Sequence, residues 1–202
     1  MTFPLLLSPK TTLAQTTVET NTGSLHSDNH ASTSPAVEEV LKTLEQLEPY
    51  VSTKSKELDF ESAKSNPLVD NNILSEYSAA LVSQGWNVKA SESDLITIQS
   101  QASEVLPTMT ALRNSCEGRN GFEAIPPAIL LDSCAATAVQ NAYNSGAGVA
   151  AIAALLTAQT GVGPLLAGAI AGALATQSGI VGLCNSWGHG VKLFPGGACW
   201  SQ

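Results

Sequence analysis

The side chains of this 202-residue chain that could carry out chemistry are four cysteines and a histidine: Cys116, Cys134, Cys184, His189 and Cys199. Cysteine and histidine together can bind zinc, and a cysteine beside a histidine can act as a nucleophile. Cys184, His189 and Cys199 supply three zinc ligands, but a fourth is missing. A Cys–His pair lacks an orienting carboxylate, because no Asp or Glu follows Asp132. The sequence also lacks hydrolase, nucleotide-loop and zinc-protease motifs, so we predict no enzyme, no metal site and no cofactor.

Disulfide bonds are another use for the cysteines. Four cysteines permit three pairings, of which Cys116–Cys134 with Cys184–Cys199 is the simplest. Each of these bonds closes a short loop, worth about 3 kcal/mol in the chain-entropy estimate. The alternative is four unpaired thiols in a cytosolic protein. Because nothing else explains the cysteines, we favour an oxidising compartment and a secreted protein.

The N-terminus allows two interpretations. The apolar residues 3–7 are too few for the core of a signal peptide, but residues 12–14 end like a signal-peptidase site. A signal peptide that starts upstream of Met1 would explain both observations, and a disordered leader is the alternative. The polar residues 15–34 cannot bury enough apolar surface to fold, so we predict a leader and a disordered linker over residues 1–34.

Charged residues are distributed unevenly along the chain. The 59 residues from Ser133 to Val191 contain no Asp, Glu, Lys or Arg. All seventeen acidic residues lie at or before Asp132, and Lys192 is the only Lys or Arg after it. No cluster of basic residues is present to hold a phosphate backbone, which excludes nucleic-acid binding. The chain therefore divides into an acidic, water-loving half and a nearly uncharged, membrane-compatible half.

Apolar periodicity predicts a small, acidic helical region over residues 35–117. Its predicted elements are a helix from Ser34-Pro35 through Leu47, a polar loop over 52–66, a helix from Asp70 to Gly85, a helix over about 93–105 ended by Pro107, and a helical turn with Met109, Leu112 and Cys116. We predict the start of the first helix from the cap residue Ser34 with the first-turn proline Pro35, and the start of the second from Asp70.

Residues 118–202 are predicted to form an apolar helical hairpin. The predicted elements are an exposed loop at 118–121, helices over 128–144, 149–158 and 164–183, and a short β-hairpin around Pro195-Gly196-Gly197. The predicted fold class is thus mainly α: a small N-terminal helical region, then a Gly/Ala-rich helical hairpin with a short β-hairpin tail closed by cysteines.

The last predicted helix has one face of small residues. On a helical wheel Gly168, Gly172, Ala175 and Gly179 fall within about 60° of each other. The large residues Leu166, Ile170, Leu174 and Val181 lie opposite. Gly168-x-x-x-Gly172 permits close helix approach in lipid, and about 20 residues just cross a bilayer core. A buried helix of a water-soluble core is the alternative, but the equally uncharged segment 135–158 favours lipid.

Two tryptophans, Trp187 and Trp200, follow the predicted helices. Amphipathic rings are enriched at the headgroup level of membranes, so both side chains would lie there if the hairpin inserts. The alternative is packing within the C-terminal β-hairpin.

This layout resembles the precursors of bacterial membrane-active toxins, the bacteriocins and sporulation-delaying-type peptides. The resemblance covers residues 116–202 and rests on the layout with Gly168-x-x-x-Gly172, Cys184-Asn185-Ser186-Trp187-Gly188-His189-Gly190-Val191 and Cys199-Trp200. It implies a secreted antimicrobial precursor whose hairpin inserts into target-cell lipid, self-associates through the small-residue face and meets an immunity or receptor protein. The acidic region would shield the hairpin until cleavage near Arg113 or Arg119. The chain departs from typical bacteriocins, since a cationic segment and a double-glycine leader are missing.

Two other functions fit the sequence. One is a non-catalytic secreted or cell-envelope protein that uses the hairpin as its folded core or as a partner-binding surface. The other is a protein whose hairpin anchors the acidic region to a membrane. Leakage of vesicles, or its absence, separates these interpretations from the toxin precursor.

Overall fold

The computed structural model describes residues 35–105, 116–175 and 179–202. They belong to one compact unit, residues 33–202. The described residues form eight α-helices, one 3-10 helix and seven short strands, so the prediction of a mainly α fold is confirmed. The prediction that strands occur only in a C-terminal hairpin is wrong, because they form a three-stranded and a four-stranded sheet. The predicted leader, the linker and the helical turn at Met109 and Leu112 lie outside the described residues.

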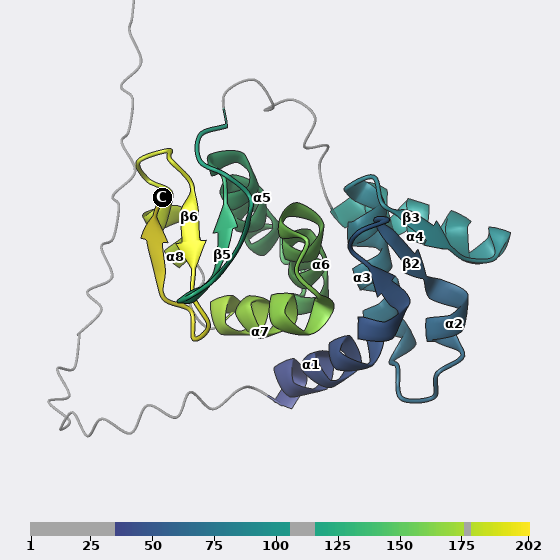
Figure 1. Cartoon of the computed structure of the whole chain (residues 1–202). Coiled ribbons are helices and arrows are strands. Elements are labelled where there is room, and N and C mark those ends of the chain that lie inside the picture. Colours follow the sequence, from purple (N-terminus) through teal and green to yellow (C-terminus); the bar gives the residue numbers. More distant parts are fainter. Residues whose placement is uncertain (1–34, 106–115, 176–178) are drawn as a thin grey trace, which may run out of the picture. The chain divides into compact units, whose positions relative to one another are not determined.

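We call residues 35–105 the acidic part, because they carry twelve acidic and five basic side chains. Its elements are α1 (Pro35–Leu47), η1 (Glu48–Tyr50), β1 (Val51–Ser52), β2 (Glu57–Asp59), α2 (Phe60–Lys64), α3 (Asn71–Ser83), β3 (Asn87–Lys89) and α4 (Glu92–Val105) (Figure 1). The three helices predicted here are confirmed as α1, α3 and α4. Asp70 accepts hydrogen bonds from the amides of Asn72 and Ile73, at 2.8 and 3.0 Å, and so pairs two N–H groups that the first turn of α3 leaves open.

Strands of a small sheet and helix α2 occupy much of the stretch 52–66 that was predicted as a loop, so that prediction is wrong. β2 pairs antiparallel with β1 and parallel with β3, where Leu58 lies opposite Val88. Leu58 is fully buried, whereas its neighbours in β2 are half-buried. One buried residue between two polar ones is too short a pattern to identify a strand, and strands this short depend on their partners.

We call residues 116–202 the disulfide-bonded part, because it contains all four cysteines. Its elements are β4 (Gly121–Ala124), β5 (Pro127–Leu131), α5 (Ser133–Asn144), α6 (Val149–Thr160), α7 (Pro164–Ala175), α8 (Ile180–Cys184), β6 (Val191–Leu193) and β7 (Cys199–Ser201). The strands form an antiparallel sheet in the order β4-β5-β6-β7. The predicted C-terminal hairpin is confirmed as β6–β7. Of the exposed loop predicted at residues 118–121, the first three residues are exposed and lead into β4, which begins at Gly121.

The prediction that a helix begins at Ala128 is wrong. Residues 127–131 form β5, in which Ile129 and Leu131 are fully buried. α5 begins only at Ser133, after Asp132 accepts a hydrogen bond from the amide of Ala135 at 2.7 Å. A short apolar run fits a buried strand and a buried helix equally well, and here the distant strand β6 decides by pairing with it.

The prediction of one continuous helix over residues 164–183 is also wrong. α7 ends at Ala175, and α8 begins at Ile180. Gly179, directly before α8, has φ +95°, a left-handed conformation that glycine adopts at little cost and that an α-helix does not contain. None of the helices in the described ranges is both long and apolar enough to cross a bilayer.

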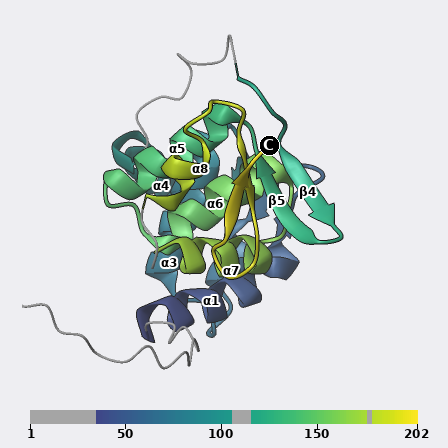
Figure 2. The same ribbon diagram turned by 90° about the vertical axis from the view of Figure 1, so that its left-hand side faces the viewer.

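Helix α6 is the centre of the core. Every residue from Ala150 to Thr157 is buried. α6 contacts α1 and α3 of the acidic part on one side, and α5, α7 and β5 of the disulfide-bonded part on others. Figure 1 shows α6 between β5 and α3, and Figure 2 shows it with other helices of both parts around it. The lack of charge in residues 150–157 is thus explained by burial on several sides at once.

Candidate functional site

The small-residue face of α7 is occupied by α1 of the same chain. A Cβ atom added to Gly168 would overlap Cδ1 of Leu44, and one added to Gly172 would come 2.7 Å from Cγ1 of Val37. Leu44 is fully buried and Val37 nearly so. The absence of side chains at the two glycines therefore allows α1 and α7 to approach closely.

The other two members of the predicted face lie elsewhere. Ala175 is exposed at the end of α7. Gly179 is exposed as well and lies outside α7, directly before α8. The predicted four-residue face is therefore covered only in its first half, because Ala175 is exposed on α7 and Gly179 lies outside that helix.

The large residues opposite the glycines are also buried. Ile170 and Leu174 are part of the core, where α7 packs on α6, and Leu166 is half-buried against it. Val181 is also buried, but it belongs to α8. Tyr143 of α5 donates a hydrogen bond to the carbonyl of Ala171 at 2.8 Å, and burial raises the pKa of this tyrosine. Helix α7 thus packs against α1 on one side and against the other helices of the disulfide-bonded part on the opposite side.

Helix α3 covers α6 through a buried polar contact. The hydroxyl of Tyr77 donates to the hydroxyl of Thr157 at 3.1 Å, and both side chains are fully buried. Burial raises the pKa of Tyr77, so the phenol stays neutral. Near the end of α6, the Gln159 side chain donates to that of Gln84 at 2.7 Å. These contacts specify how the acidic part docks on α6, because a buried polar group without its partner is costly.

Two carboxylates of the acidic part reach the N-termini of the two apolar helices. Glu48 accepts a hydrogen bond from the amide of Leu165 at 2.9 Å, and Glu76 accepts a longer one from the amide of Ala151 at 3.4 Å. A Cβ atom on Gly163 or Gly148 would overlap the respective carboxylate. A negative charge at a helix N-terminus is favourable, because the first N–H groups have no partner within the helix.

No covalent bond joins the two parts apart from the chain itself. The disulfides are Cys116–Cys134 and Cys184–Cys199, so the simplest predicted pairing is confirmed. All cysteines lie in the disulfide-bonded part, and the five ion pairs of the described residues each lie within one part. The contact between the parts consists of apolar packing, hydrogen bonds and the two carboxylate caps.

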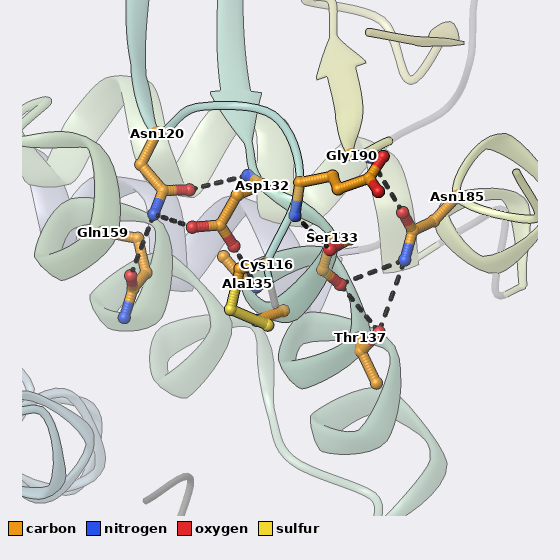
Figure 3. Close-up of a disulfide and its surroundings, with 11 residues drawn as sticks. Cys116, Asn120, Asp132, Ser133, Ala135, Thr137, Gln159, Asn185 and Gly190 are labelled. Atoms are coloured by element: carbon orange, nitrogen blue, oxygen red, sulfur yellow. Dashed lines mark hydrogen bonds between the residues drawn. A yellow bond between two sulfur atoms is a disulfide. The ribbon is translucent and has the colours of Figure 1, made fainter. Parts of the chain in front are cut away.

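A polar network surrounds the disulfide Cys116–Cys134 (Figure 3). Asn120 donates to Asp132 at 2.7 Å and lies 3.5 Å from the Gln159 side-chain oxygen. On the other side Asn185 donates to the carbonyl of Ser133 at 3.1 Å. The network thereby fixes the loop before β4 and the end of α8 to the start of α5. Asp132 and Asn185 also bond backbone directly: Asp132 accepts from the amide of Ala135, and the amide of Gly190 donates to the Asn185 side chain at 3.2 Å.

The sulfur atoms are not available as metal ligands or nucleophiles. Cys116 and Cys134 lie within 4.8 Å of an Asp132 oxygen, a spacing that would suit a metal ion, but the sulfurs are bonded to each other. Cys184 and Cys199 are likewise bonded, so neither offers a thiolate to His189. His189 instead lies 2.5 Å from a Glu117 carboxylate oxygen, in an exposed pair.

Arg119, one of the two predicted cleavage points, is held in place. Its guanidinium pairs with Glu123 at 2.6 Å. Its backbone N–H and C=O bond to the side-chain amide of Gln202, at 3.1 and 3.0 Å. Because Cys116 precedes Arg119 and is bonded to Cys134, a cut at Arg119 leaves the acidic part covalently attached. The hypothesis of release by a cut near Arg119 is therefore wrong, and Arg113 lies outside the described residues.

Both predicted interfacial tryptophans are exposed. Trp187 is 79% and Trp200 70% accessible, and Leu183 near them is 76% accessible. Trp200 has one aromatic neighbour, Phe194, whose ring centre lies 5.6 Å away in an edge-to-face arrangement. Packing within the β-hairpin therefore accounts for only a small share of the Trp200 surface.

Sequence reasoning missed Glu48, Glu76 and Gln202. The two glutamates, Glu48 in η1 and Glu76 in α3, look like other carboxylates on the wet faces of helices, and their partners lie far away in the sequence. Gly148 and Gly163 lie in glycine-rich stretches of the kind that form turns, and nothing in those stretches points to the glutamates. Comparison of the chain with protein-family models, with curated proteins and with solved structures found no match.

Proposed function

We propose that the protein is a secreted precursor in which the acidic part holds the disulfide-bonded part inactive, and that the latter perturbs target membranes after release. The observation that carries this proposal is the way in which the two parts are joined. The acidic part covers α6 and α7 by contacts that are entirely noncovalent.

Release would expose apolar surface that is now covered. Loss of α1 uncovers the Gly168–Gly172 face of α7, and loss of α3 uncovers the part of α6 around Thr157. Large exposed apolar patches are rare on water-soluble proteins and mark contact sites for membranes or other proteins. The two disulfides would stay with the released part and limit its unfolding.

A second function is favoured by a specific observation. The complete burial of residues 150–157 and the buried Tyr77–Thr157 hydrogen bond are what a permanent core requires. In that case the hairpin never leaves the fold, and the protein is a non-catalytic secreted or cell-envelope protein.

A cleavage experiment separates the two functions. A specific protease site is inserted into the segment that joins Val105 to Cys116, and in a matched control the same site is inserted directly after Arg119. Both proteins are cut and run on a non-reducing gel, and dye release from vesicles is measured. We expect the first variant to separate into two fragments and to release dye.

The control should remain one covalent species, because Cys116–Cys134 still joins its fragments, and its dye release should stay at the level of uncut protein. Fragments of the first variant that separate without dye release contradict the precursor function. Fragments that remain associated and leave vesicles intact favour the permanent core.

A further inference from the structure

Exposed apolar side chains are concentrated in the disulfide-bonded part. Of the eight large apolar side chains that are exposed among the described residues, six belong to it. They are Phe122, Ile125, Leu165, Leu183, Trp187 and Trp200. The last three lie close to the disulfide Cys184–Cys199, whose Cα atoms are 6.1 Å apart: Leu183 and Trp200 are chain neighbours of the two cysteines, and Trp187 follows Cys184 in the next turn.

Edge strand β7 separates these side chains into two groups. Directly paired residues of antiparallel strands point to the same face of a sheet. Cys199 pairs with the buried Leu193 and therefore faces the core, where its disulfide holds α8. Trp200 pairs with Lys192 and faces outward. The free edge of β7 is thus bordered by Trp200 on one face and by the end of α8, with Leu183 and Trp187, on the other.

The surroundings of this edge carry almost no net charge. The run from Ser133 to Val191 has no formally charged side chain apart from what His189 contributes, and His189 is paired with Glu117. Lys192 is paired with Glu123 at 3.0 Å. A surface of this kind gives no electrostatic attraction to anionic lipid or to a charged protein patch, whereas tryptophan prefers the interfacial region of a bilayer without needing charge.

We propose that Leu183, Trp187 and Trp200, together the β7 edge, are the surface by which the folded, uncut protein docks on a zwitterionic lipid interface. We expect this surface to bind a lipid headgroup layer rather than a protein. One tryptophan lies on each face of a short edge, and this arrangement suits a planar boundary between polar and apolar phases. This inference rests on the membrane target of the proposed function, but it does not need release of the acidic part.

The test measures binding of the uncut chain to phosphatidylcholine vesicles by tryptophan fluorescence and by vesicle sedimentation. Trp86 is only 5% exposed and supplies a constant background signal. We expect a blue shift on binding, little change in affinity between about 0.05 and 0.5 M salt, and a loss of affinity of roughly tenfold or more in Trp187→Ser/Trp200→Ser. Trp187→Ser alone, which leaves the Phe194–Trp200 contact intact, should lose part of it.

The matched control is Leu68→Ser/Ile96→Ser, which removes two side chains of the acidic part that are 59% and 63% exposed. Its vesicle affinity should equal that of the unmodified chain. Equal loss in both double variants, binding only to anionic vesicles at low salt, or no binding at all would overturn the docking surface. A chain that self-associates in solution until the tryptophans are removed would overturn it as well, since the occupant would then be a second copy.

The outcomes for docking and for the proposed function are distinguishable. Tryptophan-dependent binding of the uncut chain together with no dye release after cutting supports the docking surface and contradicts the precursor function. Dye release after cutting, together with binding of the uncut chain that is unchanged in Trp187→Ser/Trp200→Ser, supports the precursor function and contradicts the docking surface.

Discussion

Replacing Gly168 by alanine tests whether α1 fills the small-residue face of α7. The added methyl group has opposite effects on stability. In a helix interior alanine is favoured over glycine by about 0.8–1.0 kcal/mol. Against this, the new Cβ overlaps Cδ1 of the fully buried Leu44 and lies 3.2 Å from Cδ2 of Leu41. Overpacking of this kind typically costs about 1–3 kcal/mol. We therefore expect Gly168→Ala to leave the stability unchanged or to lower it by up to about 2 kcal/mol.

Two further variants isolate the packing cost. Ala169 is exposed on the same helix, so Ala169→Gly measures the local difference between alanine and glycine without a clash. Leu44→Ala removes the atom that the new methyl would meet and costs about 2–5 kcal/mol by itself. In Gly168→Ala/Leu44→Ala the overlap is relieved, so the double variant should be more stable than the sum of the single effects by about 1–3 kcal/mol.

The assay is urea unfolding of the full chain, followed by circular dichroism and by the fluorescence of the buried Trp86. A double-mutant cycle that is additive within about 0.5 kcal/mol refutes the reasoning. So does a Gly168→Ala variant that is stabilised by the full amount measured at Ala169, because the glycine would then face open space.

Three other predictions follow from the contacts described. Glu48→Gln and Glu76→Gln each remove the charge at a helix N-terminus and should cost about 0.3–1 kcal/mol, whereas Glu45→Gln on the exposed side of α1 should cost less in the same urea titration. Gln202→Ala removes a side-chain amide that donates to the carbonyls of Arg119, Leu131 and Val191, at 3.0, 2.7 and 3.2 Å, and should lower stability by about 1–3 kcal/mol. Because the amide of Arg119 donates to the same side chain, its hydrogen exchange should become faster, and unchanged exchange there would count against the contact. Hydrogen bonding to Lys192, with a further contribution from Arg119, holds the pKa of Glu123 below its usual range, so its stabilising effect should be present at neutral pH and disappear as the pH falls below the usual glutamate range; the difference in Tm between the unmodified chain and Glu123→Gln should shrink on acidification, and a difference that grows would contradict this.

Local signals in the sequence predicted local structure well. α1, α3 and α4 have amphipathic spacing, and α3 has its cap Asp70, so their positions were predictable from short windows. The two disulfides close short loops, and local pairing was the simplest of the alternatives. Each of these features depends on residues that are close together in the chain.

Features that depend on distant partners were not predictable in this way. Residues 127–131 form a strand because β6 pairs with them, and β6 follows only after four helices in the sequence. The caps by Glu48 and Glu76 join residues 117 and 75 positions apart. A single sequence contains no local signal for such contacts, and the glycines that make room for them look like ordinary turn residues.

The central difficulty is that a small-residue face has the same sequence whether its partner is a lipid-embedded helix or a helix of its own chain. Gly168 and Gly172 permit close approach in both cases, because what matters is the missing side chain and not the solvent. Here the partner is α1, which carries the complementary large residues Leu44 and Val37. α1 has amphipathic spacing and α7 does not. The polar face of α1 therefore supplies the water-facing surface that α7 lacks. The proposed precursor function therefore requires α1 to leave α7, and the contacts between the acidic and the disulfide-bonded parts contain no disulfide and no ion pair among the described residues.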